Sequence, residues 1–445
     1  MPSITVQETY TDNVRLAVPG SGEGEFVTDL SPGISLRGRS ARIRNFAADY
    51  QLQKLLYAGD AGLNNTNHLA SLEATGELFR QHLFVDVSSR YRPQNVSSFG
   101  GNAIDNISVT TDRVDTLTYR VSPYWSQRFT NIAEAELRYT FDEAISSGGG
   151  ETSRSNEYRL NVKNGSRFAR INWLVDASER NIDSDSGGET IFRNVRGRVH
   201  YLASRHWGMI GQGGYDENEV GDTVSGVLWG VGASWSPNAR TYLEGVIGER
   251  FFGRTVEFNF RYRNRRIEWI GDYTEEPTTT RDTLFEQEVF ALADAFGNPI
   301  LNPTTGQPVL LAVNQPRQTT AVILHKRFKS TLRYIRSRDR VDLNVADSKS
   351  TFDSSGDEEN HRSAELAWSH DLGPHTTSRI AVSWNQSDQG SRRDDQYVRV
   401  DVGLTRVFGR ELEGTVGARW SERESNIDTA DYRESRLFAA LTRRF

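Results

Sequence analysis

The chain ends on R-E-S-R-L-F-A-A-L-T-R-R-F, residues 433–445. Side chains of an extended strand point alternately to opposite faces. In this register one face is apolar, with Leu437, Ala439, Leu441 and Phe445. The other face is polar, with Glu434, Arg436, Thr442 and Arg444. The stretch therefore predicts a two-faced β-strand at the C-terminus.

A final aromatic residue after such alternation resembles the closing strand of a bacterial outer-membrane β-barrel. In those strands the last Phe belongs to the signal that the barrel assembly machinery reads, so this machinery is an expected partner. Arg443 departs from the pattern, because closing strands usually carry an apolar residue there. A long arginine near the end of a barrel can still reach the lipid headgroups.

The composition is compatible with a barrel and excludes a helical membrane protein. Hydrophobic residues make up 36%, charged residues 25%, and the mean hydropathy is -0.60. A transmembrane helix needs about 20 mostly apolar residues, and no such run exists. A barrel needs apolar residues only at every second strand position. A soluble β-sandwich, β-helix or propeller would have a similar composition. The net charge of -6 argues against nucleic-acid binding.

The sequence contains no cysteine, so neither disulfides nor thiolates support the fold. The N-terminus, M-P-S-I-T-V-Q-E-T-Y, has no apolar signal segment. We expect a mature chain whose signal peptide has been removed, placed in the outer membrane of a Gram-negative bacterium. Its surroundings would be the lipid bilayer and lipopolysaccharide.

The same alternation recurs along the chain in stretches that are long enough to cross a bilayer as tilted strands. One example is the run of Val256, Phe258 and Phe260, which we expect to contact lipid. Tight turns alternate with longer, acidic loops such as 216–222. This pattern predicts one antiparallel transmembrane barrel over residues 1–445, with about 22 strands in a range of 18–22. Short turns would face the periplasm and long loops the outside. The count treats 329–349 as one long irregular strand.

Residues 275–317 break the rhythm, with several prolines and many apolar residues. A connection of this length in a compact fold is usually functional. We expect a constriction, plug or lid at the barrel mouth, or a mobile docking surface. The gating residues would be Phe285, Phe290, Phe296, Asn298, Pro299, Pro303 and Gly306.

The polar strand faces carry many charges, and lysine or arginine at the lipid midplane costs about 2–4 kcal/mol. We therefore expect these side chains to line a wet lumen, where they either brace the wall or offer weak, replaceable sites to a polar polymer. The candidates are Glu134, Glu136, Arg138, Arg159, Arg170, Arg196, Arg198, Glu257, Arg261, Arg263, Arg379, Arg399, Asp401 and Arg419.

Motifs for catalysis or for a cofactor are missing. The sequence has no H-E-x-x-H, no G-x-S-x-G and no Walker motif. The eight histidines share no metal-ligand spacing. We expect no catalytic residue, no metal and no cofactor. Acidic loops could bind calcium, although solvated loops explain them equally well.

Several segments resemble outer-membrane proteins that are associated with exosortase (PEP-CTERM) exopolysaccharide gene clusters. They are L-F-V-D-V-S (83–88), D-N-I-S-V (105–109), T-Y-R-V-S-P-Y (118–124), A-E-L-R-Y-T-F-D (135–142), R-F-F-G (250–253) and F-G-N-P-I-L-N-P-T-T-G-Q-P (296–308). The resemblance implies export of an exopolysaccharide, beside a periplasmic polysaccharide-export protein. The alternatives are a general diffusion porin for small hydrophilic solutes and an outer-membrane barrel hydrolase.

Overall fold

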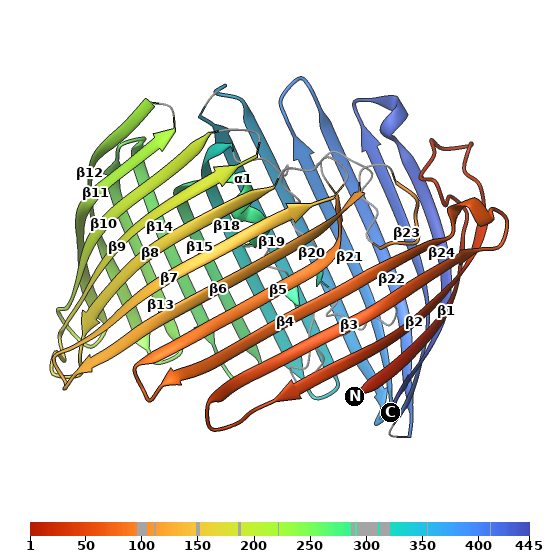
Figure 1. The fold of residues 1–445 in the computed structure, drawn as a ribbon, viewed down its shortest axis with the longest axis horizontal. Helices are drawn as coiled ribbons and strands as arrows, with labels where there is room; N and C mark the ends of the chain where they lie inside the picture. Colours follow the sequence, from red (N-terminus) through yellow and green to blue (C-terminus); the bar gives the residue numbers. More distant parts are fainter. Residues whose placement is uncertain are drawn as a thin grey trace.

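A single antiparallel sheet of 22 strands curls until its first strand meets its last (Figure 1). We describe this barrel from a computed structural model. Strand β1 (Pro2–Thr11) pairs with β24 (Tyr432–Arg444) in the register Thr5↔Thr442, which closes the cylinder. Closure leaves the described 22-stranded sheet without a free edge strand, as a membrane-spanning sheet requires. The described residues are 1–95, 105–110, 113–147, 152–185, 188–220, 222–285, 290–291, 310–311, 321–353, 355–409 and 411–445.

The other wall strands follow in chain order, each hydrogen-bonded to the next. They are β2 (Glu25–Gly38), β3 (Ile43–Tyr57), β4 (Asn65–Phe79), β5 (Leu83–Asn95), β6 (Arg113–Phe129), β7 (Ala133–Ser146), β8 (Ser153–Asn164), β9 (Ile171–Ser184), β10 (Glu189–Leu202), β11 (Trp207–Val220), β12 (Asp222–Asn238), β13 (Thr241–Arg250), β14 (Gly253–Arg263), β15 (Ile267–Thr279), β18 (Val322–Arg336), β19 (Asp339–Phe352), β20 (Glu358–Gly373), β21 (Thr376–Asp388), β22 (Asp394–Phe408) and β23 (Leu412–Ser425).

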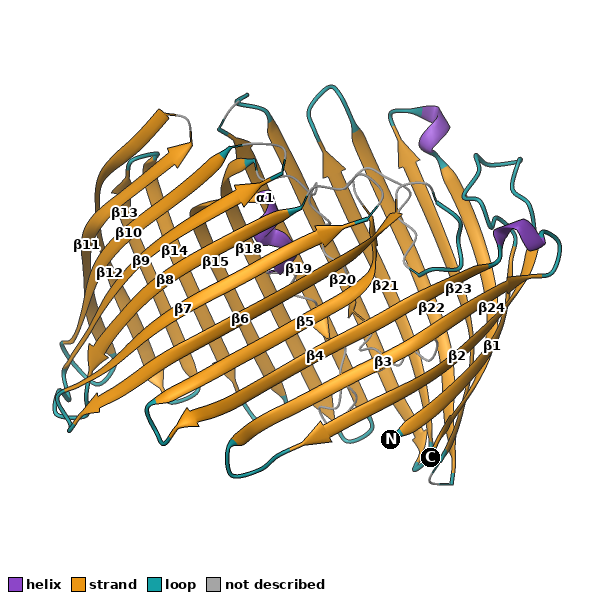
Figure 2. Ribbon diagram, viewed as in Figure 1, coloured by secondary structure: helices purple, strands orange, loops and turns teal. Residues whose placement is uncertain are grey.

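Three short helices and a separate two-stranded sheet complete the described part of the chain (Figure 2). The helices are η1 (Ala61–Leu63), α1 (Thr280–Phe285) and η2 (Asp428–Ala430), and the small sheet pairs β16 (Phe290–Ala291) with β17 (Leu310–Leu311). No helix among the described residues is both long and apolar enough to cross a membrane.

The two ends of the barrel differ in their connections. Both termini lie at the end where short turns join the strands, which is the periplasmic end (Figure 1). Two of these turns are 239–240 between β12 and β13, and 337–338 between β18 and β19. Longer connections lie at the opposite, extracellular end, including 12–24 between β1 and β2.

Three predicted boundaries differ from the structure. Residues 329–349 form the hairpin β18–β19 and not one strand, because Ser337 turns the chain with φ 47°. Residues 216–220 continue β11 and residue 222 begins β12, so 216–222 is not a long loop. Residues 275–279 continue β15, so the inserted segment starts later than predicted.

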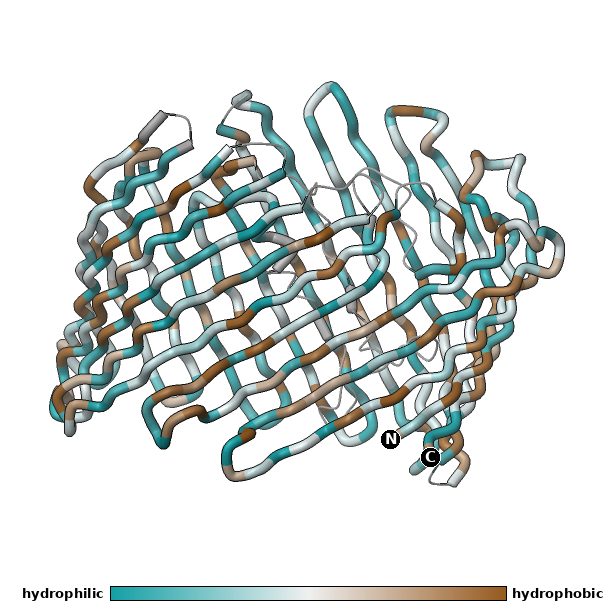
Figure 3. The backbone as a smooth tube through the Cα atoms, viewed as in Figure 1, coloured by the Kyte–Doolittle hydropathy of each residue, from teal (hydrophilic) through white to brown (hydrophobic). Residues whose placement is uncertain are grey.

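Hydropathy alternates along the strands (Figure 3). Outward positions carry exposed apolar side chains, among them Val195, Ile247, Val256, Val416 and Leu437. An outward aromatic girdle surrounds the periplasmic end: Phe79, Phe129, Trp207, Trp235, Trp269, Phe408 and Phe445. Aromatic residues at this level are typical of the boundary between hydrocarbon and headgroups. The chain is an outer-membrane barrel of the Gram-negative type, surrounded by lipid.

A charge on the lipid face of β14 should impair assembly. We expect Phe258→Arg to destabilise the inserted barrel by about 2–4 kcal/mol, because Phe258 points outward near the middle of the strand. The matched control is Asn259→Arg, which places the same charge on the adjacent, inward position. Refolding into vesicles, followed by heat-dependent migration on gels, measures the folded fraction. Equal folding of both variants would contradict the assigned faces.

Candidate functional site

The structure places the predicted lumen residues on the inner wall, with one exception. The residues at inward positions are Glu134, Glu136, Arg138, Arg159, Arg196, Arg198, Glu257, Arg261, Arg263, Arg379, Arg399, Asp401 and Arg419. Arg170 lies in the turn before β9 and is exposed there, so it is not part of the wall. A direct role of these residues in translocation stays a prediction.

Many wall charges pair either within one strand or across one or more intervening strands. Arg138 contacts Asp86 at 2.8 Å and Glu136 at 2.9 Å. Glu257 contacts Arg196 at 3.4 Å and Arg198 at 3.7 Å. These pairs keep charged groups stable on a curved inner surface, and they leave a lumen of mixed sign.

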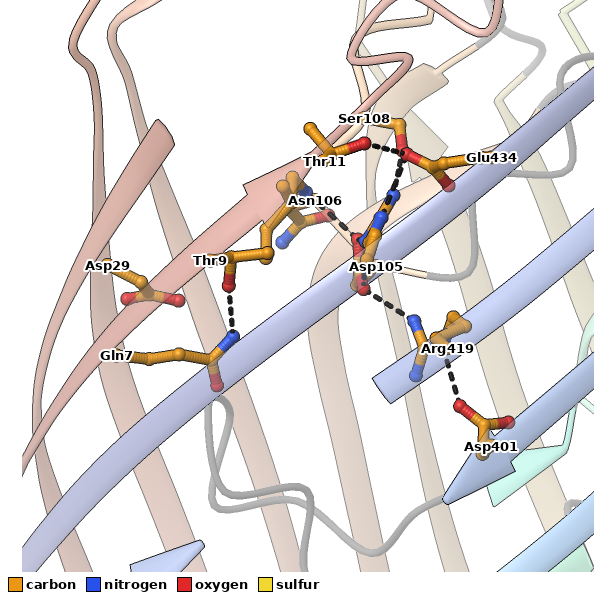
Figure 4. Close-up of polar contacts among 12 residues, drawn as sticks. Gln7, Thr9, Thr11, Asp29, Asp105, Asn106, Ser108, Asp401, Arg419 and Glu434 are labelled. Atoms are coloured by element: carbon orange, nitrogen blue, oxygen red, sulfur yellow. Dashed lines mark hydrogen bonds and ion pairs between the residues drawn. The ribbon is translucent and has the colours of Figure 1, made fainter. Parts of the chain in front are cut away.

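Residues 105–110 belong to the extracellular connection between β5 and β6, and they fold inward. They dock on the wall formed by β23, β24 and β1, which β2 to β4 separate from β5 in the sheet. The carboxylate of Asp105 accepts hydrogen bonds from Arg436 at 2.7 Å and from Arg419 at 2.8 Å (Figure 4). Arg419 also contacts Asp401 at 2.6 Å. We call Asp105, Ser108, Asp401, Arg419, Glu434 and Arg436 the seam cluster.

Hydrogen bonds to Glu434 extend the seam cluster to the first strand of the barrel. Ser108 donates to Glu434 at 3.2 Å, and Thr11 donates to the same oxygen at 2.8 Å (Figure 4). Arg436 lies 2.8 Å from Glu434 and also donates to Ser108. One carboxylate therefore joins the inserted segment to both strands that close the barrel.

An apolar contact at Ile107 supports the polar contacts of the seam cluster. Ile107, 2% exposed, packs with Val14, Val27, Leu55 and Tyr57. Tyr57 donates to the carbonyl oxygen of Ile107 at 2.7 Å, and the amide of Val109 donates to the carbonyl oxygen of Val14 at 2.9 Å. Residues 105–110 are thus held as part of the folded structure.

The charge state of Asp105 follows from its neighbours. Burial alone would raise its pKa, but the guanidinium groups of Arg436 and Arg419 outweigh burial and hold the pKa of Asp105 well below the usual range. A hydrogen bond from the backbone amide of Ile107 acts in the same direction. Asp105 is therefore ionised at any physiological pH.

Helix α1 makes a second inward contact. It follows β15 directly, yet its side chains reach β7, β8 and β9, which β10 to β14 separate from β15. Arg281, 1% exposed, contacts Asp142 at 2.5 Å and donates to Ser153 at 2.7 Å. Asp282 accepts a hydrogen bond from Arg180 at 2.8 Å. We call Asp142, Ser153, Arg180, Arg281 and Asp282 the α1 anchor.

Most of the predicted gating residues fall outside the described residues: Phe296, Asn298, Pro299, Pro303 and Gly306. Phe285 ends helix α1, and Phe290 pairs with Leu311 in the small sheet. The part of the segment that the structure does describe points into the barrel at α1, through residues that sequence reasoning did not select. Gating by this segment stays a prediction.

Sequence reasoning missed both anchors. The alternation of D-N-I-S-V (105–109) is typical of a strand, but these residues form no strand and lie inside the barrel. The available signal was weak: Asp105 interrupts a run of small and apolar residues in a connection. Arg281 and Asp282 look like polar loop residues in the sequence, because only the folded wall supplies their partners.

The two anchored segments narrow the extracellular half of the lumen from different sides. Arginine–carboxylate contacts fix both segments to the wall, and backbone hydrogen bonds hold them as well. Among the described residues, no group of three or more His, Asp or Glu side chains could hold a metal ion.

No family model and no curated protein matches the sequence. Solved structures do match in fold. The siderophore receptor PirA from Acinetobacter baumannii has a TM-score of 0.53 at 9% identity, over 100% of this chain and 80% of that one. The FrpB iron transporter from Neisseria meningitidis, in its apoprotein form, has a TM-score of 0.53 at 11% identity. That match covers 99% of this chain and 81% of the transporter. A mutant of the ferric enterobactin receptor (PfeA) from Pseudomonas aeruginosa has a TM-score of 0.51 at 10% identity. That match covers 100% of this chain and 80% of the receptor.

These matches correct the function expected from sequence. They are receptors and transporters for iron and siderophores, so they are transport proteins and not enzymes. Export of an exopolysaccharide with a periplasmic export partner is therefore wrong, and so is the general diffusion porin. The resemblance to exosortase-associated proteins has no matching family or curated protein behind it and stays a prediction.

Proposed function

We propose that this barrel is an uptake receptor that brings a polar ligand of the iron-chelate class across the outer membrane. The observation that carries the proposal is the pair of inward segments, each fixed to a distant part of the wall by buried arginine–carboxylate contacts. A passive pore needs no such attachments, whereas a receptor must hold its lumen closed until a ligand arrives. The iron and siderophore receptors of similar fold support this reading.

The wall chemistry fits a ligand with many oxygen atoms. Inward residues beneath the anchors include Arg196, Arg198, Arg261 and Arg263 together with Glu244 and Glu257. Guanidinium groups form directed hydrogen bonds with catecholate, hydroxamate or carboxylate oxygens. The interspersed carboxylates prevent any one site from becoming too strong, so that a ligand can leave toward the periplasm.

Uptake of radiolabelled iron tests the proposal. The barrel is expressed in a Gram-negative strain that lacks its own siderophore receptors, and cells are given ferric complexes of the catecholate, hydroxamate and carboxylate classes. We expect at least one class to enter about tenfold faster than in cells with an empty vector. The non-assembling Phe258→Arg variant is the negative control.

Planar bilayers provide a second measurement. The purified barrel should show no steady conductance without ligand, because both segments are anchored. A large, permanent, ligand-independent current, or no uptake of any ferric complex, would contradict the proposed function.

A further inference from the structure

Arginine dominates the turns at the periplasmic end. Turn 39–42 reads R-S-A-R, 80–82 reads R-Q-H, 165–170 reads G-S-R-F-A-R, 203–206 reads A-S-R-H and 264–266 reads N-R-R. Arg240 and Arg338 occupy two further turns. Glu411 is the one acidic residue in these connections. The rim therefore carries a strong positive charge, although the whole chain has a net charge of -6.

The arginines of this rim are available to a partner. We define the periplasmic rim by these exposed side chains: Arg39, Arg42, Arg80, Arg167, Arg170, Arg205, Arg240, Arg265, Arg266 and Arg338. Within the described part of the chain, none of them forms an ion pair with a carboxylate. Like charges in a ring repel one another, so their concentration here favours the binding of negative charges from outside the chain.

Outward cations at the extracellular end are arranged differently. Arg193 contacts Glu217 at 2.5 Å, and Lys349 contacts Glu358 at 2.7 Å. Arg433 pairs with Glu422 in the same way. These three extracellular cations are neutralised by carboxylates of the same chain, whereas the arginines of the periplasmic rim are not.

The rim lies at the level of lipid headgroups. Its turns directly follow the outward aromatic girdle, which includes Trp207, Trp235 and Trp269. Short turns keep guanidinium groups close to the membrane surface. At the same level, two outward arginines lie over aromatic rings: Arg443 over Phe445 at 4.8 Å, and Arg406 over Phe408 at 5.5 Å.

We propose that the periplasmic rim binds the headgroups of anionic phospholipids in the inner leaflet of the outer membrane. The shared chemistry is a phosphate diester with a net negative charge, held by exposed arginines beside an aromatic girdle. Each such arginine near a membrane surface strengthens binding about fivefold at low salt. The contacts fix the height of the barrel in the bilayer and do not depend on the transported ligand.

Tryptophan quenching by brominated lipids tests the proposal. The full chain is reconstituted in zwitterionic vesicles that contain either brominated phosphatidylglycerol or brominated phosphatidylcholine, at low and at high salt. The rim variant is Arg240→Gln with Arg265→Gln and Arg266→Gln, next to Trp235 and Trp269. The matched control removes three exposed extracellular arginines by Arg362→Gln, Arg392→Gln and Arg433→Gln.

We expect the unaltered chain to prefer the anionic lipid, and the rim variant to lose that preference by about tenfold or more. The extracellular control variant should keep the preference for the anionic lipid. High salt should weaken this preference in the unaltered chain, because salt screens exposed charges. Equal preference in the rim variant and the unaltered chain would overturn the proposal. An equal loss of lipid preference in the extracellular control variant would also overturn it. So would an unaltered chain that shows no lipid preference while its rim binds anionic cell-wall fragments.

Discussion

Asp105→Asn is expected to release residues 105–110 from the wall. The neutral amide cannot balance the guanidinium groups of Arg419 and Arg436, which contact the carboxylate at 2.8 and 2.7 Å. Removing one partner of a buried charge pair costs about 3–5 kcal/mol. The arginines keep Asp401 and Glu434 as partners, so the wall remains folded while the segment detaches.

Cysteine labelling measures this release, because the chain contains no cysteine of its own. A single Ile107→Cys probe lies at a position that is 2% exposed. We expect Asp105→Asn to raise its labelling rate by at least about 100-fold, because tenfold corresponds to about 1.4 kcal/mol. Asp60→Asn, at an exposed ion pair with Arg15, is the control and should change nothing.

The pH dependence of this contact has a definite sign. The pKa of Asp105 is lower in the folded barrel than in an unfolded chain, so its stabilisation is complete above the ordinary pKa of an aspartate. It is lost only as the pH falls through the depressed folded value. Labelling of the Ile107→Cys probe should therefore be the same at pH 7 and pH 5. Release on mild acidification would show that the carboxylate does not hold the segment.

Arg281→Gln is expected to release helix α1. The glutamine cannot span the contacts that Arg281 makes with Asp142 and Ser153. Asp142 is left buried at 2% side-chain exposure, with only Arg120 at 3.8 Å as a further ion-pair partner among the described residues. We expect a loss of about 3–5 kcal/mol in the docking of α1. A Thr280→Cys probe, at 3% exposure, reports the release by faster labelling. Single-channel recordings should show openings that the unaltered barrel lacks.

A double substitution separates a lost ion pair from general damage. Asp142→Asn in the Arg281→Gln background removes the buried carboxylate that has lost Arg281, so part of the docking free energy should return. Arg154→Gln removes an exposed arginine from its ion pair with the buried Glu143 nearby, and it should leave the labelling rate unchanged. Fast labelling in the Arg281→Gln variant, in the double variant and in the Arg154→Gln control would mean that the extracellular end of the barrel has unfolded.

The release of each segment also bears on uptake. If both anchors hold a closed receptor, Asp105→Asn and Arg281→Gln should let small solutes leak through without any ferric ligand. Loss of uptake without leakage would instead indicate that the segments contribute to ligand binding.

The sequence by itself determined the barrel. Alternation in the last strand placed Leu437 and Leu441 outward and Arg436 and Thr442 inward, and the structure confirms this. The reason is local, since a strand has a period of two and lipid accepts only one of its faces. The outer-membrane location and the wall positions of residues such as Arg138 and Glu257 follow from the same rule. The number of 22 strands agrees with the structure, although the count took 329–349 as one strand and these residues form two.

Only the tertiary structure decided which connections enter the lumen and what holds them there. Asp105 meets Arg436 across 331 residues, and Arg281 meets Ser153 across 128. Such partners share no sequence period, because closure of the sheet brings them together. The ring of rim arginines likewise becomes one surface only when the turns gather at one end of the cylinder. The physical reason is that strand faces follow from local backbone geometry, whereas lumen contacts follow from the curvature of the closed wall.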